Sequence, residues 1–200
     1  MNFDDHTLVN KCLSGDKKAF EQLVRRYSPC VFHIIHRFFN DKFLVADIAQ
    51  EVFIKAYTSL KTYRQKSPFE NWLLKITIHI CYRQLQIQRK HRKTLQSDIS
   101  SEDCALLDGF CFPSHHVNTV NQEQRALYRD IVEKILQKLS PKEKMVLILT
   151  EVDGMTTQEV SQLMGLSPVN IKVVKFRAKR HALKVLKTLS KISQQREAIS

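Results

Sequence analysis

Residues 156–180, TTQEVSQLMGLSPVNIKVVKFRAKR, constrain the fold of this chain more than any other stretch. Thr156, with Glu159 three residues later, forms the capping box of a helix start. Gly165 suits a left-handed helix end because it has no Cβ, and Pro168 suits the first turn of a second helix. The stretch therefore predicts a helix-turn-helix, a motif whose second helix enters a DNA major groove.

The second predicted helix has one apolar side and several basic ones. Its apolar seam consists of Ile171, Val174, Ala178 and Ala182. Polar side chains crowd its other faces: Asn170, Lys172, Lys175, Arg177, Lys179 and Arg180. The alternative interpretation is a surface helical hairpin with solvated lysines, since short helical turns are common.

The charge of the chain is high and unevenly distributed. The net charge is +12 and the pI about 9.6, which favours a polyanionic partner such as nucleic acid or a membrane surface. Residues 75–93 and 172–191 are basic and contain no acid, whereas residues 94–122 contain acids and no Lys or Arg. Two basic helices separated by an acidic connector fit two contacts on one long polyanion.

Composition favours helices and an intracellular setting. Only 4 glycines and 5 prolines occur in 200 residues, which disfavours turn-rich β structure. The cysteine count is odd and no signal peptide is apparent, so a reduced cytoplasmic protein is expected. No apolar run approaches the roughly 20 residues that span a bilayer, so no membrane insertion is expected.

The predicted fold class is all-α, with two small helical domains joined by a flexible linker. Residues 1–93 form an N-terminal helical bundle that ends with a helix over 69–93, and residues 94–122 form the linker. Residues 123–190 form a four-helix domain with the helix-turn-helix, and residues 191–200 form a short polar tail.

Residues 44–60 predict a helix with two distinct faces. A broad stripe is expected to be buried: Val45, Ile48, Ala49, Val52, Phe53, Ala56 and Tyr57. Asp47, Gln50 and Glu51 share another face, because spacings of three and four residues bring side chains together on a helix. This acidic patch indicates a basic protein partner; the alternative is an ordinary solvated face.

Several segments, in this order, resemble bacterial RNA polymerase sigma factors of the extracytoplasmic-function (group IV) type. LVADIAQEVFIKAY (44–57) resembles their core-polymerase-binding helix, with its D-x-x-Q-E signature, and YRQKSPFENWLLKI (63–76) resembles their promoter −10 element. LSPKEKMVLIL (139–149) and the helix-turn-helix resemble their −35-reading domain, and GDKKAFEQLVRRY (15–27) also fits.

The resemblance implies a role for three sets of residues. Asp47, Gln50 and Glu51 would dock on a basic coiled coil of the polymerase's largest subunit. The residues for the −10 element would be Tyr63, Arg64, Lys66, Lys75, His79 and Arg83. Those for the −35 element would be Asn170, Lys172, Val173, Phe176 and Arg177.

The resemblance also implies partners and an activity. The partners are core RNA polymerase, promoter DNA that is duplex at −35 and melted at −10, and an anti-sigma factor that holds the protein inactive. The protein would direct polymerase to promoters without being an enzyme and without a cofactor. No phosphate-binding glycine loop, zinc-protease pair or nucleophile elbow is present in the sequence.

Several side chains allow two interpretations. Tyr63 offers a stacking surface for a flipped base, whereas Trp72 is expected to lie mostly in the core. Phe176 either packs on the preceding helix or faces DNA. The family usually has Asn at the position of His79, Asp at that of Arg83 and a small polar residue at that of Val173. The promoter sequence that this protein recognises therefore cannot be inferred from that of its relatives.

The predicted linker contains four residues of metal-binding type, Cys104, Cys111, His115 and His116. Their spacing matches no standard zinc motif, so chance clustering is the stronger interpretation, and no metal is predicted. Two other functions compete with the sigma factor: a stand-alone helix-turn-helix regulator, and an adaptor that does not bind DNA. Neither accounts for both the acidic patch and the two basic helices.

Overall fold

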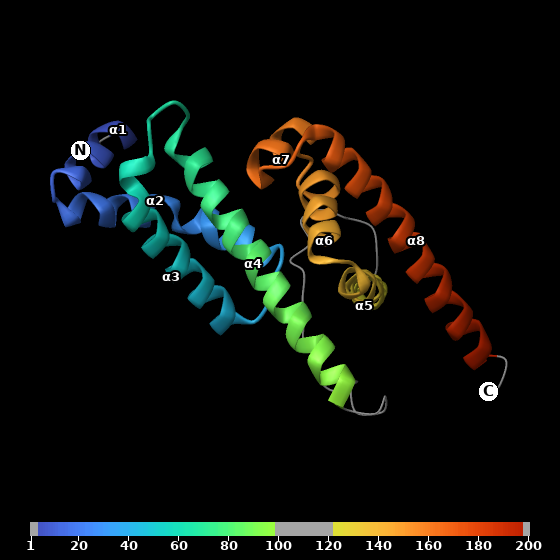
Figure 1. Cartoon of the computed structure of the whole chain (residues 1–200). Coiled ribbons are helices and arrows are strands. Elements are labelled where there is room, and N and C mark those ends of the chain that lie inside the picture. Colours follow the sequence, from blue (N-terminus) through green and yellow to red (C-terminus); the bar gives the residue numbers. More distant parts are fainter. Residues whose placement is uncertain (1–3, 99–121, 198–200) are drawn as a thin grey trace. The chain divides into compact units, whose positions relative to one another are not determined.

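The computed structural model describes residues 4–98 and 122–197, and every regular element in these ranges is helical (Figure 1). The chain divides into two compact units, one up to residue 109 and one from residue 110 onward. The all-α fold class with two helical regions is confirmed.

The first unit is a bundle built around α2. Its elements are α1 (Asp5–Leu13), α2 (Lys17–His36), α3 (Lys42–Ser59), η1 (Leu60–Thr62) and α4 (Phe69–Asp98). The carboxylates of Asp16 and Asp41 accept backbone N–H groups at 2.9 Å and so cap α2 and α3. Helix α2 packs against α1, α3 and α4, while α3 also packs against α4.

The apolar stripe of α3 is buried largely as its spacing predicts. Its innermost members are Val45, Ile48, Ala49, Val52 and Ala56. Tyr57 is an exception, because it is 44% exposed, although its ring makes an edge-to-face contact with that of Phe20 at 4.9 Å. The prediction that Tyr57 is buried is therefore wrong: it lies at the margin of the stripe, where the neighbouring helix covers it only in part.

The second unit is organised around the long helix α8. Its elements are α5 (Gln122–Lys138), α6 (Pro141–Leu147), the π-helical turn η2 (Ile148–Val152), α7 (Thr157–Met164) and α8 (Pro168–Glu197). Helix α8 packs against α5, α6 and α7, and it carries the fully buried Ile171 and Ala178 into their core.

The helix-turn-helix forms as its sequence predicts. Thr156 and Glu159 make both bonds of the capping box at the start of α7. Gly165 ends α7 with φ +64°, a left-handed conformation that costs a residue with a Cβ about 1–2 kcal/mol. The hydroxyl of Ser167 accepts the N–H of Asn170 at 3.2 Å and so caps α8.

Two helices are longer than predicted. Helix α4 continues beyond residue 93 to Asp98, so the first residues assigned to the linker are helical. Helix α8 likewise continues beyond residue 190 to Glu197 and includes most of the predicted tail. Neither extension contains the glycine or proline that would interrupt a helix, so the change in composition does not mark the helix end.

Candidate nucleic-acid and polymerase interfaces

The acidic patch of α3 is open to solvent at two of its three members. Asp47 and Gln50 are exposed. Glu51 forms an ion pair with Arg83 of α4, and the two side chains are 42% and 55% exposed. The structure thus joins a residue predicted to bind polymerase with one predicted to bind the −10 element. Sequence reasoning missed this pair, since the two residues are 32 positions apart.

Tyr63 is built into an aromatic cluster rather than displayed on the surface. Its side chain is 7% exposed, and its hydroxyl donates a hydrogen bond to the Ser67 carbonyl at 2.7 Å. The ring centroid lies 5.5 Å from those of both Phe69 and Trp72, and burial raises the pKa of the phenol. The expectation of an open stacking surface at Tyr63 is therefore wrong for this structure, because its ring fills the space beside Phe69.

Trp72 is half-buried in the same cluster, as its helical spacing with Phe69 predicts. Tyr27 of α2 completes the cluster, with its ring 5.4 Å from that of Phe69. The aromatic residues around the start of α4 consequently hold the loop that precedes it against α2.

The loop between η1 and α4 has a second anchor. Gln65 adopts a left-handed conformation with φ 55°, and its side-chain amide donates to Asn10 Oδ1 of α1 at 3.1 Å. Arg64 and Lys66, on either side of it, are exposed. The loop therefore presents two cations from a backbone that α1 holds in place, which the sequence does not indicate.

On α4, Lys75, His79 and Arg83 lie in a row because they are spaced by four residues. All three side chains are exposed. His79 Nδ1 donates to the Lys75 carbonyl at 2.7 Å, since a carbonyl can only accept, and Nε2 is left for another partner. The predicted −10 residues on α4 thus share one surface.

Helix α8 exposes every residue predicted for the −35 element. These residues are Asn170, Lys172, Val173, Phe176 and Arg177. Phe176 is 67% exposed, so the alternative in which it packs on α7 is wrong. Nearby on α8, Lys175 and Lys179 bind the two carboxylate oxygens of Glu151 at 2.7 and 2.9 Å. These contacts lower the pKa of the Glu151 carboxyl and connect α8 to η2.

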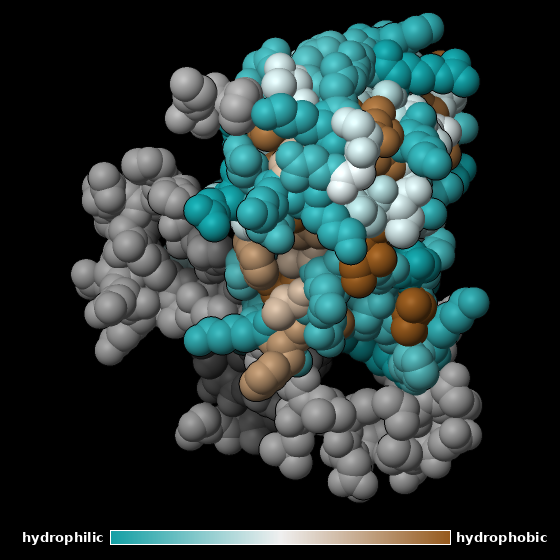
Figure 2. Space-filling view, turned by 90° about the vertical axis from the view of Figure 1, so that its left-hand side faces the viewer, coloured by the Kyte–Doolittle hydropathy of each residue, from teal (hydrophilic) through white to brown (hydrophobic). Residues whose placement is uncertain are grey.

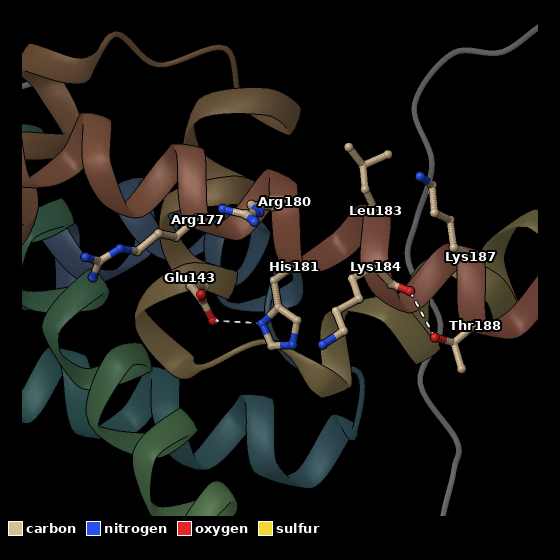
Figure 3. Close-up of a pocket in the computed structure, with 8 residues that line it drawn as sticks. All are labelled: Glu143, Arg177, Arg180, His181, Leu183, Lys184, Lys187 and Thr188. Carbon is tan, nitrogen blue, oxygen red and sulfur yellow. Dashed lines mark hydrogen bonds and ion pairs between the residues drawn. The ribbon is translucent and has the colours of Figure 1, made fainter.

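Further along α8, basic side chains line an open hollow (Figure 3). Its lining consists of Glu143, Arg177, Arg180, His181, Leu183, Lys184, Lys187 and Thr188. Burial raises the pKa of Glu143, but hydrogen bonds from Ser140 and His181 outweigh it and leave the pKa lowered. The Lys and Arg side chains of the lining give this side of α8 a strongly positive surface suited to phosphate groups: Arg177, Arg180, Lys184 and Lys187.

The described residues contain no group of three or more His, Cys, Asp or Glu that could hold a metal ion. Cys104, Cys111, His115 and His116 lie outside the described residues. None of the described helices is long and apolar enough to cross a membrane. On the face drawn in Figure 2, the described residues are mainly hydrophilic, with hydrophobic patches among them.

Comparisons with known proteins match both units. A family model for sigma-70 region 2 matches residues 23–91, and one for sigma-70 region 4 matches residues 129–181. The RNA polymerase sigma-H factor of Pseudomonas aeruginosa is 31% identical over 189 residues, covering 92% of this chain and 95% of the relative. The ECF RNA polymerase sigma-E factor of Haemophilus influenzae is 29% identical, covering 88% and 91%.

Two solved structures share the fold. CnrH, in complex with the cytosolic domain of CnrY, has a TM-score of 0.55 at 21% identity and covers 92% of this chain and 97% of that chain. The sigma factor RpoE of Bartonella quintana, in complex with the anti-sigma factor NepR, has a TM-score of 0.54 at 19% identity and covers 85% and 98%.

A helical protein with an exposed basic recognition helix belongs to the class of helix-turn-helix DNA-binding proteins. The matches to both regions define it further: the chain belongs to the sigma-70 family and is a sigma factor of the extracytoplasmic-function type. It directs core RNA polymerase to promoters, and the stand-alone regulator is not favoured.

Proposed function

We propose that the exposed end of the acidic patch, Asp47 and Gln50, makes the first contact with core polymerase, and that Glu51 joins after leaving Arg83. The supporting observation is that Asp47 and Gln50 are exposed on a helix whose other face is buried. An exposed ion pair contributes only about 0–1 kcal/mol, so a basic partner can displace Arg83 at little cost.

Replacing Asp47 with Lys tests this contact. Because the side chain is exposed, the Asp47→Lys variant should fold normally and lose co-purification with core polymerase. The matched control is Glu21→Lys, which reverses an exposed charge on α2 of the same unit. Retention of polymerase by Asp47→Lys, or equal loss in both variants, contradicts the assignment.

We propose that the −10 element is read by the exposed cations and the histidine of the first unit: Arg64, Lys66, Lys75, His79 and Arg83. Tyr63 supports this surface from the core and is released to stack on a base only if the loop opens. Arg64 and Lys66 contact phosphates of the melted strand, as single-strand binding requires. Run-off transcription on genomic fragments, with core polymerase alone as the control, should yield promoter-dependent transcripts only when the protein is added.

The −35 element is assigned to the N-terminal turns of α8, with Asn170, Lys172, Val173, Phe176 and Arg177 facing the groove. The proposed domain boundaries are those expected from sequence, residues 1–93 and 123–190, with α4 and α8 extending beyond them. The protein itself is proposed to be non-catalytic, to need no cofactor and to act in the cytoplasm.

An anti-sigma factor is a further proposed partner. It is supported by the shared fold with the sigma factor RpoE of Bartonella quintana, which was solved bound to the anti-sigma factor NepR. Co-purification of an inhibitor that suppresses the run-off transcripts would support it; transcription at full level in lysate from cells grown without any inducing stress would contradict it.

A further inference from the structure

Three apolar side chains line the solvent side of the first turns of α8. Val169, Val173 and Phe176 are spaced by four and three residues, so they form one row, here called the apolar strip. They are 69%, 41% and 67% exposed. Ala178 lies nine positions after Val169, about half a turn round the helix, and is fully buried. The apolar strip therefore lies opposite the seam that anchors α8.

The apolar strip needs an explanation because it is continuous. Single exposed apolar residues are ordinary, but a contiguous exposed row marks a contact surface. Its position identifies the kind of contact, since the N-terminal turns of a recognition helix are the part that meets base edges.

The charges beside the apolar strip select DNA as its occupant. Lys172 precedes Val173 and Arg177 follows Phe176, so the two cations lie on opposite sides of the row. Both are exposed, and neither forms an ion pair within the described residues. Cations on both sides of an apolar centre match a major groove about 12 Å wide with phosphates along both walls. A second copy of the chain would bring like charges together.

Within the major groove, the one methyl group on a base edge is the C5-methyl of thymine. Valine and the phenylalanine ring cannot donate or accept the hydrogen bonds that distinguish the other base edges. We propose that the apolar strip reads thymine methyl groups in the −35 element, while Lys172 and Arg177 hold the flanking phosphates. This inference rests on the proposed assignment of α8 to the −35 element.

Replacing thymine with uracil tests the proposal, because uracil lacks only the methyl group. Binding of the full chain with core polymerase is measured on a promoter first found by run-off transcription. Uracil at every thymine of the −35 element should weaken binding by about fourfold for each methyl group contacted, as expected for one buried methylene-sized group. Uracil at thymines of the spacer is the control and should have no effect.

Variants of the apolar strip should change the response to uracil. With Val173→Ala and Phe176→Ala, thymine and uracil promoters should be bound about equally, while Val152→Ala should keep the discrimination. Val152 is a matched control because it is 54% exposed on η2, outside α8. All three side chains are exposed, so folding should be unaffected, which circular dichroism checks.

Several results would overturn the proposal. They are equal binding of thymine and uracil promoters, a −35 element that contains only G·C pairs, or strip variants that still bind the thymine promoter more tightly than the uracil promoter. If promoter-dependent transcripts appear and uracil has no effect, only this inference fails. If no such transcript appears, the proposed function fails with it.

Discussion

The two units display their candidate functional residues in different ways. In the first unit some of these residues also make contacts within the fold: Tyr63 fills the aromatic cluster, and Arg83 binds Glu51. In the second unit, Val173 and Phe176 project from α8 while Ile171 and Ala178 hold the helix from the other side. A change at Tyr63 therefore mixes stability with recognition, whereas a change at Val173 or Phe176 can alter recognition alone.

The largest expected effect is the difference in unfolding free energy between the same substitution, Phe to Ala, made in each of the two units. Phe69→Ala should destabilise the first unit by about 3–5 kcal/mol, because Phe69 is 2% exposed and its loss leaves a cavity among three other rings. Phe176→Ala should change the stability of the second unit by less than about 0.5 kcal/mol. Urea denaturation followed by circular dichroism measures both, and a large loss in Phe176→Ala would break the comparison.

The turn of the helix-turn-helix gives the next effect. Gly165→Ala should cost the second unit about 1–2 kcal/mol from left-handed backbone strain, since no atom lies within 4 Å of the added Cβ. Gly165→Asn is the control and should cost less, because asparagine tolerates this conformation. Thermal denaturation compares the two; equal stability of Gly165→Ala and the natural chain would contradict the assigned conformation.

A smaller effect separates the two roles of Tyr63. Tyr63→Phe keeps the ring but removes the hydrogen bond to Ser67, so it should cost about 0.5–1.5 kcal/mol of unfolding free energy. Transcription from the melted promoter should be retained, because the ring remains. A variant of unchanged stability would show that the hydroxyl does not hold the loop. The hydroxyl of Tyr63 would then contribute nothing to the stability of the first unit, as Phe176 contributes little to that of the second.

The smallest effect is a pH dependence in the second unit. The pKa of Glu143 is lowered from 4.5, so its contribution to stability is present above pH 4.5 and is lost as pH falls through the folded-state pKa. Glu143→Gln can keep the capping bond to Ser140 without the charge, so its stability should vary less with pH between 6 and 3, about 0.5 kcal/mol in all. Urea midpoints across that range test this, and parallel curves would contradict it.

Sequence alone determined the features that depend on near neighbours in the chain. The capping box of Thr156 and Glu159, the left-handed Gly165 and the buried row of α3 follow from local backbone chemistry and from the helical period. The resemblance to sigma factors rested on motifs of this local kind, and the matches to both regions confirm it.

Tertiary structure alone decided which side chains face solvent and which are paired at a distance. Tyr63 and Phe176 are both aromatic residues in candidate DNA-binding segments, yet one is buried and the other exposed. The contacts of Glu51 with Arg83 and of Asn10 with Gln65 join residues 32 and 55 positions apart. Such outcomes depend on how helices pack together, and helical periodicity describes only one helix at a time.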